Sequence, residues 1–329
     1  MKMKNSFILG FALILMIGIL SACGDSSNES KGNSDKFPEK AITLIVPWSA
    51  GGGTDTGARI LQPYLEEELG QTVTVVNKTG GGGWVGWNEL ANAKPDGYTI
   101  GYANSPHIIT GYLNPELKRD KDLDDFTALG MHVIDPDTIS VREDEDRFTT
   151  MEELIEYAKE HPLTATATGE GTDEHLVILN MNKKYGTKFE PVHFDGAAET
   201  HTAVLGKHVD VLVGNLGEIL SLNADGKINV LGVAAKERSE FLPDVPTLEE
   251  QGFEIYQESS RGLLGPKDMD PEVVEKIKTA LKKAIENEEH IDKMADLGFG
   301  VHYEDGDTYM NVLKEDEQAV KELNDLLGW

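Results

Sequence analysis

The chain has 329 residues, of which 39% are hydrophobic and 27% charged, and its formal net charge is −28. This length and apolar content suffice for a large buried core. So acidic a surface repels nucleic acid and anionic lipid headgroups, and we expect neither as a partner. The single cysteine excludes disulfides and thiolate metal sites within the chain. The nine histidines show no H-E-x-x-H pattern, so we expect no metal and no cofactor.

The first 22 residues have the layout of a secretory signal peptide. Lys2 and Lys4 precede an apolar run over residues 7–20, and small residues follow it. That run is shorter than the roughly 20 residues that a membrane-spanning helix needs. Cys23 stands where a bacterial lipobox places its cysteine, which becomes the lipidated (palmitate-bearing) N-terminus of the mature protein. Residues 23–36 are almost entirely polar and predict a flexible tether with a reach of roughly 20 Å.

Strand-like and helical segments alternate through the first part of the chain, which predicts an α/β fold with mostly parallel strands. We expect strands over 41–46, 72–76 and 99–103, and helices over 54–69 and 85–93. Ala58, Leu61, Leu65 and Leu69 form the core-facing stripe of the first helix. Polar or glycine-rich loops follow each strand, over 47–53, 77–83 and 104–107. Ligands bind beyond the carboxyl ends of such strands, so these loops are expected to line one cleft.

A second block starts near residues 135–137 and repeats the alternation. Its expected strands are 163–167, 189–193, 209–213 and 228–234, and its expected helices include 151–161 and 173–184. A last part returns to a strand over 262–264, a helix capped by Asp270 with Pro271 at its first position, and helices near 289–297 and 308–327. Two such α/β lobes suggest a cleft that closes on a ligand by hinge motion.

The glycine triplet Gly51–Gly53 ends the first strand and opens the first helix. Glycines allow a ligand to approach the backbone closely, and the helix N-terminus adds free N–H donors and a partial positive charge. The lysine and hydroxyl residue of a nucleotide-binding loop are missing, so a carboxylate cradle is the preferred interpretation. Asp55 would repel a bound anion. It either pairs with Arg59 one turn later or receives an amine or hydroxyl of the ligand.

The chain resembles the substrate-binding proteins of tripartite tricarboxylate transporters, also called Bug proteins, from about Phe37 to its end. The resemblance rests on the order and spacing of four motifs: ITLIVPWSAGGGTD (42–55), AKPDGYT (93–99), LPDVPT (242–247) and GLLGP (262–266). It implies a two-lobed periplasmic-binding-protein fold of type II, with residues 37–134 and 258–329 in one lobe and 135–257 in the other. It also implies capture of a small carboxylate and delivery to a permease of one large and one small membrane subunit.

Carried over by position, the resemblance implies a ligand site built from both lobes. The first lobe would supply Trp48, Ser49, Gly51, Gly52, Gly53, Thr54, Asp55, Asn104 and Ser105. The second would supply Thr168, Gly169, Thr172 and His175, with Asp195 and Asn215 bordering the cleft. Trp48 is expected in the cleft wall because Pro47 ends the strand before it.

The chain departs from the family at two places that bear on the choice of ligand. Arg261 stands where the family commonly has an aromatic residue. It is either a solvated surface residue or a ligand contact that binds a carboxylate through two hydrogen bonds. The second-lobe loop is acidic, through Glu170, Asp173 and Glu174. These acids either complement a helix N-terminus, which we favour for Glu174, or meet a positive group of the ligand. His175 is either a ligand contact or a residue of a helix cap.

We therefore expect a monomeric, non-catalytic, extracytoplasmic solute-binding lipoprotein on the outer face of the cytoplasmic membrane. Its ligand would be a di- or tricarboxylate such as citrate. A binding subunit that signals to a membrane sensor is an alternative with the same closure. A secreted hydrolase is disfavoured because the chain has no G-x-S-x-G motif and no metal motif.

Overall fold

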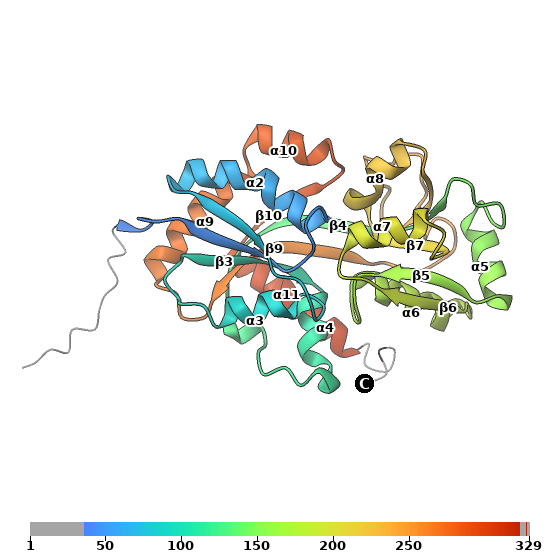
Figure 1. Ribbon diagram of the computed structural model, residues 1–329, viewed down its shortest axis with the longest axis horizontal. Helices are drawn as coiled ribbons and strands as arrows, with labels where there is room; N and C mark the ends of the chain where they lie inside the picture. Colours follow the sequence, from blue (N-terminus) through green and yellow to red (C-terminus); the bar gives the residue numbers. More distant parts are fainter. Residues whose placement is uncertain (1–35, 323–326, 328–329) are drawn as a thin grey trace, which may run out of the picture. The chain divides into compact units, whose positions relative to one another are not determined.

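The structure is a computed structural model that describes residues 36–322 and 327. The expected signal peptide, Cys23 and nearly all of the tether lie outside these residues. Residues from Lys36 onward form one compact unit. Within the described part, a mixed sheet has the strand order β2-β1-β3-β9-β4-β7-β5-β6, and β8 and β10 also pair with β4 (Figure 1).

Parallel strands form the two outer runs of the sheet. In the first run, β1 (Ile42–Val46) pairs in parallel with β2 (Val73–Asn77) and with β3 (Thr99–Ser105). In the second, β5 (Leu163–Ala167) pairs in parallel with β6 (Phe189–His193) and β7 (Val211–Asn215). The predicted α/β fold is confirmed, and these runs have the predicted parallel direction.

The centre of the sheet is antiparallel, which the sequence did not predict. The 17-residue strand β4 (Phe126–Arg142) runs antiparallel to β9 (Glu258–Pro266), to β7, to β8 (Ile228–Val233) and to β10 (Gly300–Asp305). β9 is also antiparallel to β3. Residues 135–137, where the sequence suggested a new block, lie inside β4. Two acids around a proline resemble a turn, but here the polar groups of Asp135 and Asp137 are buried against residues distant in the sequence.

The helices flank the sheet and begin close to where the sequence placed them. The core-facing stripe of α2 is buried as predicted, and Asp270 accepts from Glu272 N at the start of α9 with Pro271 in the first turn. Helices α4 and α8 were not predicted. The helices are α2 (Gly53–Leu69), α3 (Trp84–Ala91), α4 (His107–Leu113), α5 (Met151–Glu160), α6 (Asp173–Tyr185), α7 (Ala197–Leu205), α8 (Leu216–Ala224), α9 (Pro271–Ile285), α10 (Glu288–Ala295) and α11 (Gly306–Glu322), with short 3₁₀ turns η2 (Pro115–Leu117) and η3 (Leu123–Asp125).

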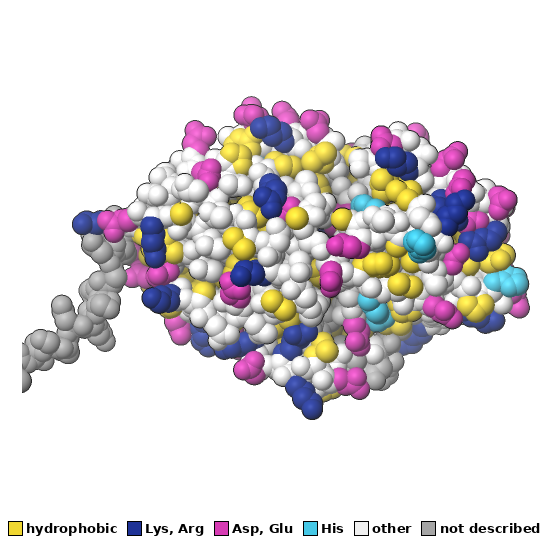
Figure 2. Space-filling view, viewed as in Figure 1, with side chains coloured by type: hydrophobic (Ala, Val, Ile, Leu, Met, Phe, Trp, Pro, Cys, Tyr) yellow, Lys and Arg dark blue, Asp and Glu magenta, His cyan; other side chains and the backbone are white. Residues whose placement is uncertain are grey.

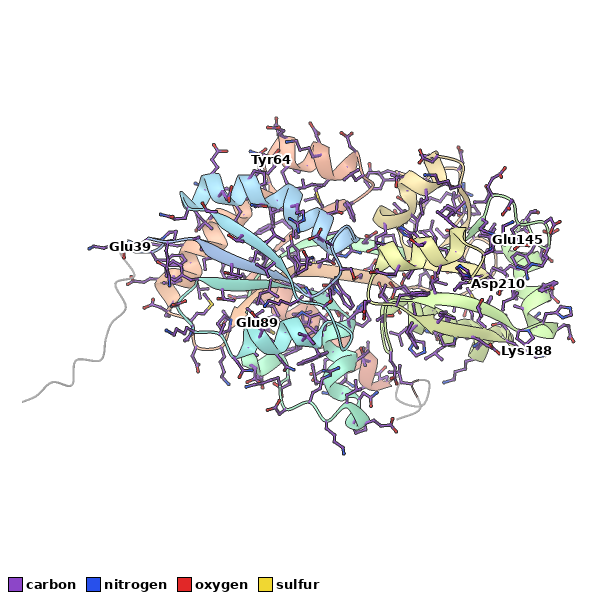
Figure 3. All side chains as sticks on the ribbon, in the orientation of Figure 1. Glu39, Tyr64, Glu89, Glu145, Lys188 and Asp210 are labelled. Atoms are coloured by element: carbon purple, nitrogen blue, oxygen red, sulfur yellow. The ribbon has the colours of Figure 1, made fainter. Side chains whose placement is uncertain are left out.

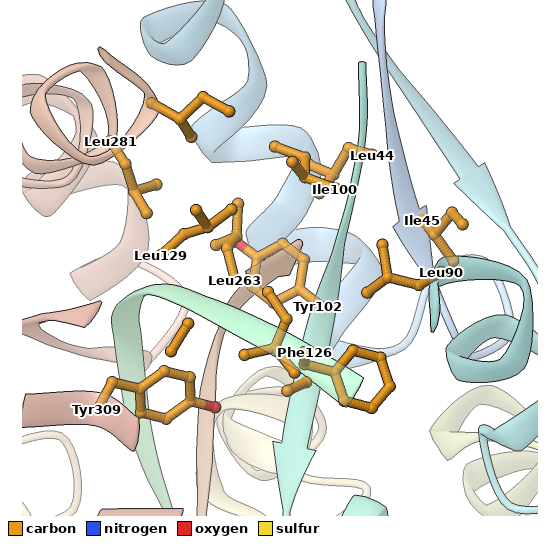
Figure 4. Close-up of a cluster of buried hydrophobic side chains, with 14 of the residues drawn as sticks. Leu44, Ile45, Leu90, Ile100, Tyr102, Phe126, Leu129, Leu263, Leu281 and Tyr309 are labelled. Atoms are coloured by element: carbon orange, nitrogen blue, oxygen red, sulfur yellow. The ribbon is translucent and has the colours of Figure 1, made fainter. Parts of the chain in front are cut away.

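Separate hydrophobic clusters hold the two ends of the sheet. The largest packs side chains of β1, β3 and β9 against α9 and α11, including Leu44, Leu263, Leu281 and Tyr309 (Figure 4). A second cluster packs α5 and α6 against β5 and β7. At that end Arg147 bridges Glu145 and Asp210, both at 2.7 Å (Figure 3). Among the described residues, no helix has the length and apolar character to cross a membrane.

Candidate functional site

A small cavity lies where the carboxyl ends of β1, β3, β5 and β7 meet strand β9. Its volume is about 20 Å³, which is room for about one water molecule. The predicted convergence of loops at strand ends therefore occurs, but in a closed arrangement. The residues that line this inner cavity are Trp48, Gly52, Gly53, Thr54, Asn104, His107, Thr168, Glu174, Gly196, Ala197, Asn215, Glu218, Ser259 and Arg261.

An outer pocket of about 460 Å³ adjoins the inner cavity and shares Trp48 and Thr168 with it. Its remaining lining residues are Gly80, Gly82, Gly83, Gly169, His193, Phe194, Asp195 and Glu199. Charged side chains of both signs are interspersed over the face of the molecule seen in Figure 2.

The glycine turn has internal partners for its N–H groups. Gly51 N donates to Asp55 Oδ2 at 2.9 Å, and Gly52 N donates to Ser49 O at 3.4 Å. Gly53 N, in the first turn of α2, donates to Glu218 Oε1 at 3.1 Å. Glu218 comes from the first turn of α8, on the other side of the cavity. Of the three glycine N–H groups in the predicted cradle, that of Gly53 thus donates to a carboxyl group of the protein from across the cavity.

Arg261 is the buried cation of the site, with 3% of its surface exposed. Its Nη2 lies 2.8 Å from Asn215 Oδ1, 3.0 Å from Asp135 Oδ2 and 3.4 Å from Glu218 Oε1. Its Nη1 and Nε have no hydrogen-bond partner among the described residues. Burial alone would lower the pKa of Arg261, but the neighbouring carboxylates raise it, so the guanidinium is charged. The expectation of a solvated surface arginine is wrong.

Four carboxyl groups neighbour this arginine: Asp135, Asp173 and Glu174 are buried, and Glu218 is nearly so, with 10% of its side chain exposed. A fifth buried acid, Asp137, contacts Asn215. Burial, and then the charge of Asp173, raises the pKa of Glu174 to about 7. Burial also raises the pKa of Glu218 to about 7, although Arg261 opposes the shift. The pKa of Asp173 rises to about 6, again mainly through burial. The cluster therefore titrates near neutral pH.

His107 and Trp48 form the aromatic side of the cavity. The His107 Nε2 atom lies 3.2 Å from Asp173 Oδ1 and 4.0 Å from Glu174 Oε2. Burial lowers the pKa of His107 to about 4, so the imidazole is neutral at pH 7. Among the residues that the structure describes, His107, Asp173 and Glu174 form a group whose ligand atoms are close enough together to hold a metal ion. Trp48 packs edge-on against His107 and donates from Nε1 to Asn104 Oδ1 at 2.9 Å.

The structure gathers most of the sequence-predicted residues around the two cavities. Trp48, Gly52, Gly53, Thr54, Asn104, Thr168, Asn215 and Arg261 line the inner one, and Gly169 and Asp195 line the outer one. Ser49 lies nearby, and its Oγ donates to Glu199 Oε1 at 3.2 Å.

Besides Ser49, five predicted residues line neither cavity, and their polar groups have partners within the protein. Gly51 and Asp55 bond to each other, and Asp55 also accepts from Arg59 Nε at 2.9 Å, the pairing that the sequence offered as one alternative. Ser105 donates to Asp316, Thr172 caps α6, and His175 Nδ1 accepts from Gly171 N.

Sequence reasoning missed several lining residues, above all Glu218 and Ser259, and included His107 only as the last residue of the loop 104–107 that was expected to line the cleft. Glu174 was noticed but interpreted as a helix-end residue, although it is buried and lines the cavity. Glu218 and Gly53 are 165 positions apart, so no local motif connects them. Glu218 follows the end of β7 by three residues, and Thr168 and Gly196 likewise follow the ends of β5 and β6 closely. This position just beyond a strand end was the feature of the sequence that could have indicated a cavity residue.

Comparisons with known proteins agree on the family. The model of the tripartite tricarboxylate transporter family receptor matches residues 58–328. A UPF0065 protein of Cupriavidus necator is 31% identical over 94% of both chains. The solved structure of the periplasmic binding protein BugD is 28% identical, with a TM-score of 0.82 over 89% of this chain and 99% of its own. MatC from Rhodopseudomonas palustris, solved with bound malate, shares the fold at 24% identity and a TM-score of 0.80, over 88% of this chain and all (100%) of its own. The chain therefore belongs to the tripartite tricarboxylate transporter receptor family of solute-binding proteins.

Proposed function

We propose that this receptor captures a small carboxylate outside the cytoplasmic membrane and delivers it to the large and small permease subunits of a tripartite transporter. In this proposal residues 1–22 are removed and a lipid on Cys23 anchors the protein through the 23–36 tether. The observation that carries the ligand class is the position of Glu218. Its carboxylate is held jointly by Gly53 N and Arg261 Nη2, at 3.1 and 3.4 Å.

Glu218 occupies the place that we assign to a ligand carboxylate. A helix N-terminal N–H and a guanidinium are the donors that proteins use for carboxylates, and both lower the pKa of Glu218, against the burial and the neighbouring acids that raise it. Arg261 retains two donor atoms, Nη1 and Nε, that have no hydrogen-bond partner among the described residues, so it can donate to a ligand carboxylate. Displacement of Glu218 by the ligand would therefore leave the same donors satisfied.

Binding requires the closed cavity to open, because about 20 Å³ does not admit a dicarboxylate. We assign the opening to a hinge between the lobe of residues 37–134 and 258–329 and the lobe of residues 135–257. The bonds from Ser49 Oγ to Asp195 O and Glu199 Oε1 join the first lobe to the second and would break on opening. Trp48 and Thr168 stand between the outer pocket and the inner cavity, on the ligand's path.

A binding screen tests the proposal directly. Thermal stabilisation by citrate, isocitrate, malate, succinate, aspartate, glutamate or aromatic acids identifies a ligand for calorimetry. Arg261→Ala should then weaken binding by about 2–3 kcal/mol, the scale of a charge-assisted hydrogen bond. Arg238→Ala, which removes a surface arginine paired with Glu250, is the matched control and should leave affinity unchanged.

Two results would contradict the proposal. One is a screen in which none of these acids raises the melting temperature. The other is an Arg261→Ala protein that is folded by circular dichroism and binds with wild-type affinity. If that variant does not fold, Gly53→Ala provides a second test, because its Cβ would lie 2.5 Å from Arg261 Nη1 and 2.6 Å from Glu218 Oε1. Binding should be lost in this variant as well.

A further inference from the structure

The inner cavity has polar groups of both signs that lack partners within the described part of the chain. Toward Gly53, the guanidinium atoms Arg261 Nη1 and Nε have no acceptor. Toward α6, the fully buried Asp173 Oδ1 makes no hydrogen bond within the described residues, and the nitrogen beside it is His107 Nε2 at 3.2 Å. Ligating atoms of Asp173, His107 and Glu174 lie within 4.8 Å of one another, and His107 and Glu174 line the cavity. Unpaired buried polar atoms are costly, so a partner is expected at both ends.

The charges around the cavity do not suit a ligand that brings only negative charge. Arg261 already faces Asp135 and Glu218, and His107 is neutral at pH 7. If a ligand carboxylate replaces Glu218, then Asp135, Asp173, Glu174 and the ligand carboxylate all share the single charge of Arg261. A second ligand carboxylate placed beside them would meet like charge in a buried site, where repulsion is strong.

We propose that the ligand of this receptor carries a protonated amine beside its carboxylate, so that it is a zwitterion of the amino-acid type. Its carboxylate takes the place of Glu218 at Gly53 N and Arg261. Its ammonium group donates to Glu174 and Asp173. This inference rests on the proposed function and changes the ligand class from plain di- or tricarboxylates, such as citrate, to amino-substituted acids.

The geometry of Glu174 fits this role. Both of its carboxylate oxygens accept from Thr168 Oγ1 at 3.0 Å, which fixes the carboxylate at the cavity wall. Asp173 Oδ2 accepts from Asn215 Nδ2 at 2.9 Å, which leaves Oδ1 for another donor. An ammonium group has three donors and is close to a water molecule in size, so it suits a space of about 20 Å³. The ligand's side chain would extend past Trp48 and Thr168 toward the outer pocket.

Matched pairs of acids that differ only in the ammonium group test the inference. Calorimetry would compare aspartate with succinate, glutamate with glutarate, and phenylalanine with 3-phenylpropionate. We expect at least one amino acid to bind ten-fold or more tightly than its partner. Glu174→Gln should remove most of that preference, whereas Glu170→Gln, an exposed acid of the same loop, should keep it.

The possible failures are distinguishable. Succinate, glutarate or citrate binding as tightly as the amino acids would overturn this inference and leave the proposed function intact. Binding of succinate or citrate that appears only with Mg²⁺ or Zn²⁺, and is abolished by EDTA, would assign the acidic groups to a metal ion and also overturn it. A preference for the amino acids that survives in Glu174→Gln would overturn the assignment of Glu174. Absence of binding by every acid would overturn both proposals.

Discussion

Replacing Glu218 by glutamine should change how the stability of the protein depends on pH. Glu218 is buried, and its pKa rises from 4.5 to about 7. A pKa raised in the folded state means that the folded protein binds the proton more tightly than the unfolded chain does. The resulting stabilisation of the folded state is complete at pH values below the pKa of Glu218 in the unfolded chain, and it is lost as the pH rises through about 7. Glutamine resembles the protonated acid and should not show this loss.

The magnitude follows from the size of the shift. One pKa unit corresponds to about 1.4 kcal/mol, so Glu218 ionisation costs the folded state about 3 kcal/mol at pH 8. Between pH 5 and pH 8, the stability of Glu218→Gln relative to wild type should therefore rise by about 2–3 kcal/mol. Buried histidines such as His107, whose pKa falls to about 4, change stability in the opposite direction below pH 6.5. They are present in both proteins, so their effect cancels in the difference.

Urea denaturation of the ligand-free proteins at pH 5 and pH 8 measures this difference. Glu237→Gln removes an exposed acid and should follow wild type at both values. The reasoning is refuted if the free-energy difference between wild type and Glu218→Gln is the same at both pH values, with unchanged denaturant slopes. Such a result would mean that Glu218 is solvated and does not sit at Gly53 and Arg261.

Two further substitutions test packing near the site. Gly111→Ala should lower the free energy of unfolding by about 1–3 kcal/mol, because its Cβ would collide with Nε1 of the buried Trp84. Gly214→Ala is the control, because its Cβ would meet its nearest atom at an ordinary contact distance of 3.6 Å. Equal melting temperatures for the two variants would contradict the prediction. Asp55→Ala should lower the free energy of unfolding by about 2–4 kcal/mol, because Gly51 N, Arg59 Nε and Asn77 Nδ2 all lose their acceptor. If urea denaturation gives this variant wild-type stability, the Asp55 carboxylate does not hold the loop.

Local signals in the sequence predicted most of the outer strands and helices. The spacing of Leu61, Leu65 and Leu69 fixes the buried face of α2, and Asp270 with Pro271 fixes the start of α9, because these effects involve neighbours within one or two turns. Strand β4 was missed for the opposite reason. Its acids Asp135 and Asp137 are tolerated in a buried strand through Gly217 N and Asn215 Nδ2, which are about 80 positions away, and through Arg261, which is farther still.

At the site, too, features set by neighbouring residues were predicted, and features set by residues far apart in the sequence were not. The loop Trp48–Thr54 was predicted because glycines and a helix start are recognisable along the chain. The contact between Gly53 N and Glu218 was not predicted, because it forms only when the two parallel runs of the sheet are brought together. The acidity of residues 170–174 was visible in the sequence. The burial of Asp173 and Glu174, which places Glu174 in the cavity wall, was not visible there.

The long strands at the centre of the sheet have a consequence for how such a receptor can evolve. Arg261 lies on β9 and Asp135 on β4, and β9 pairs with β4 through both positions. Arg261, which we propose to bind the ligand carboxylate, and its partner Asp135 are thus part of the only strands that join the two parallel runs within the described sheet. A substitution that alters ligand choice here also alters the mechanical coupling between the runs. Lineages that change ligand should therefore acquire compensating substitutions along these two strands as well as in the binding loops.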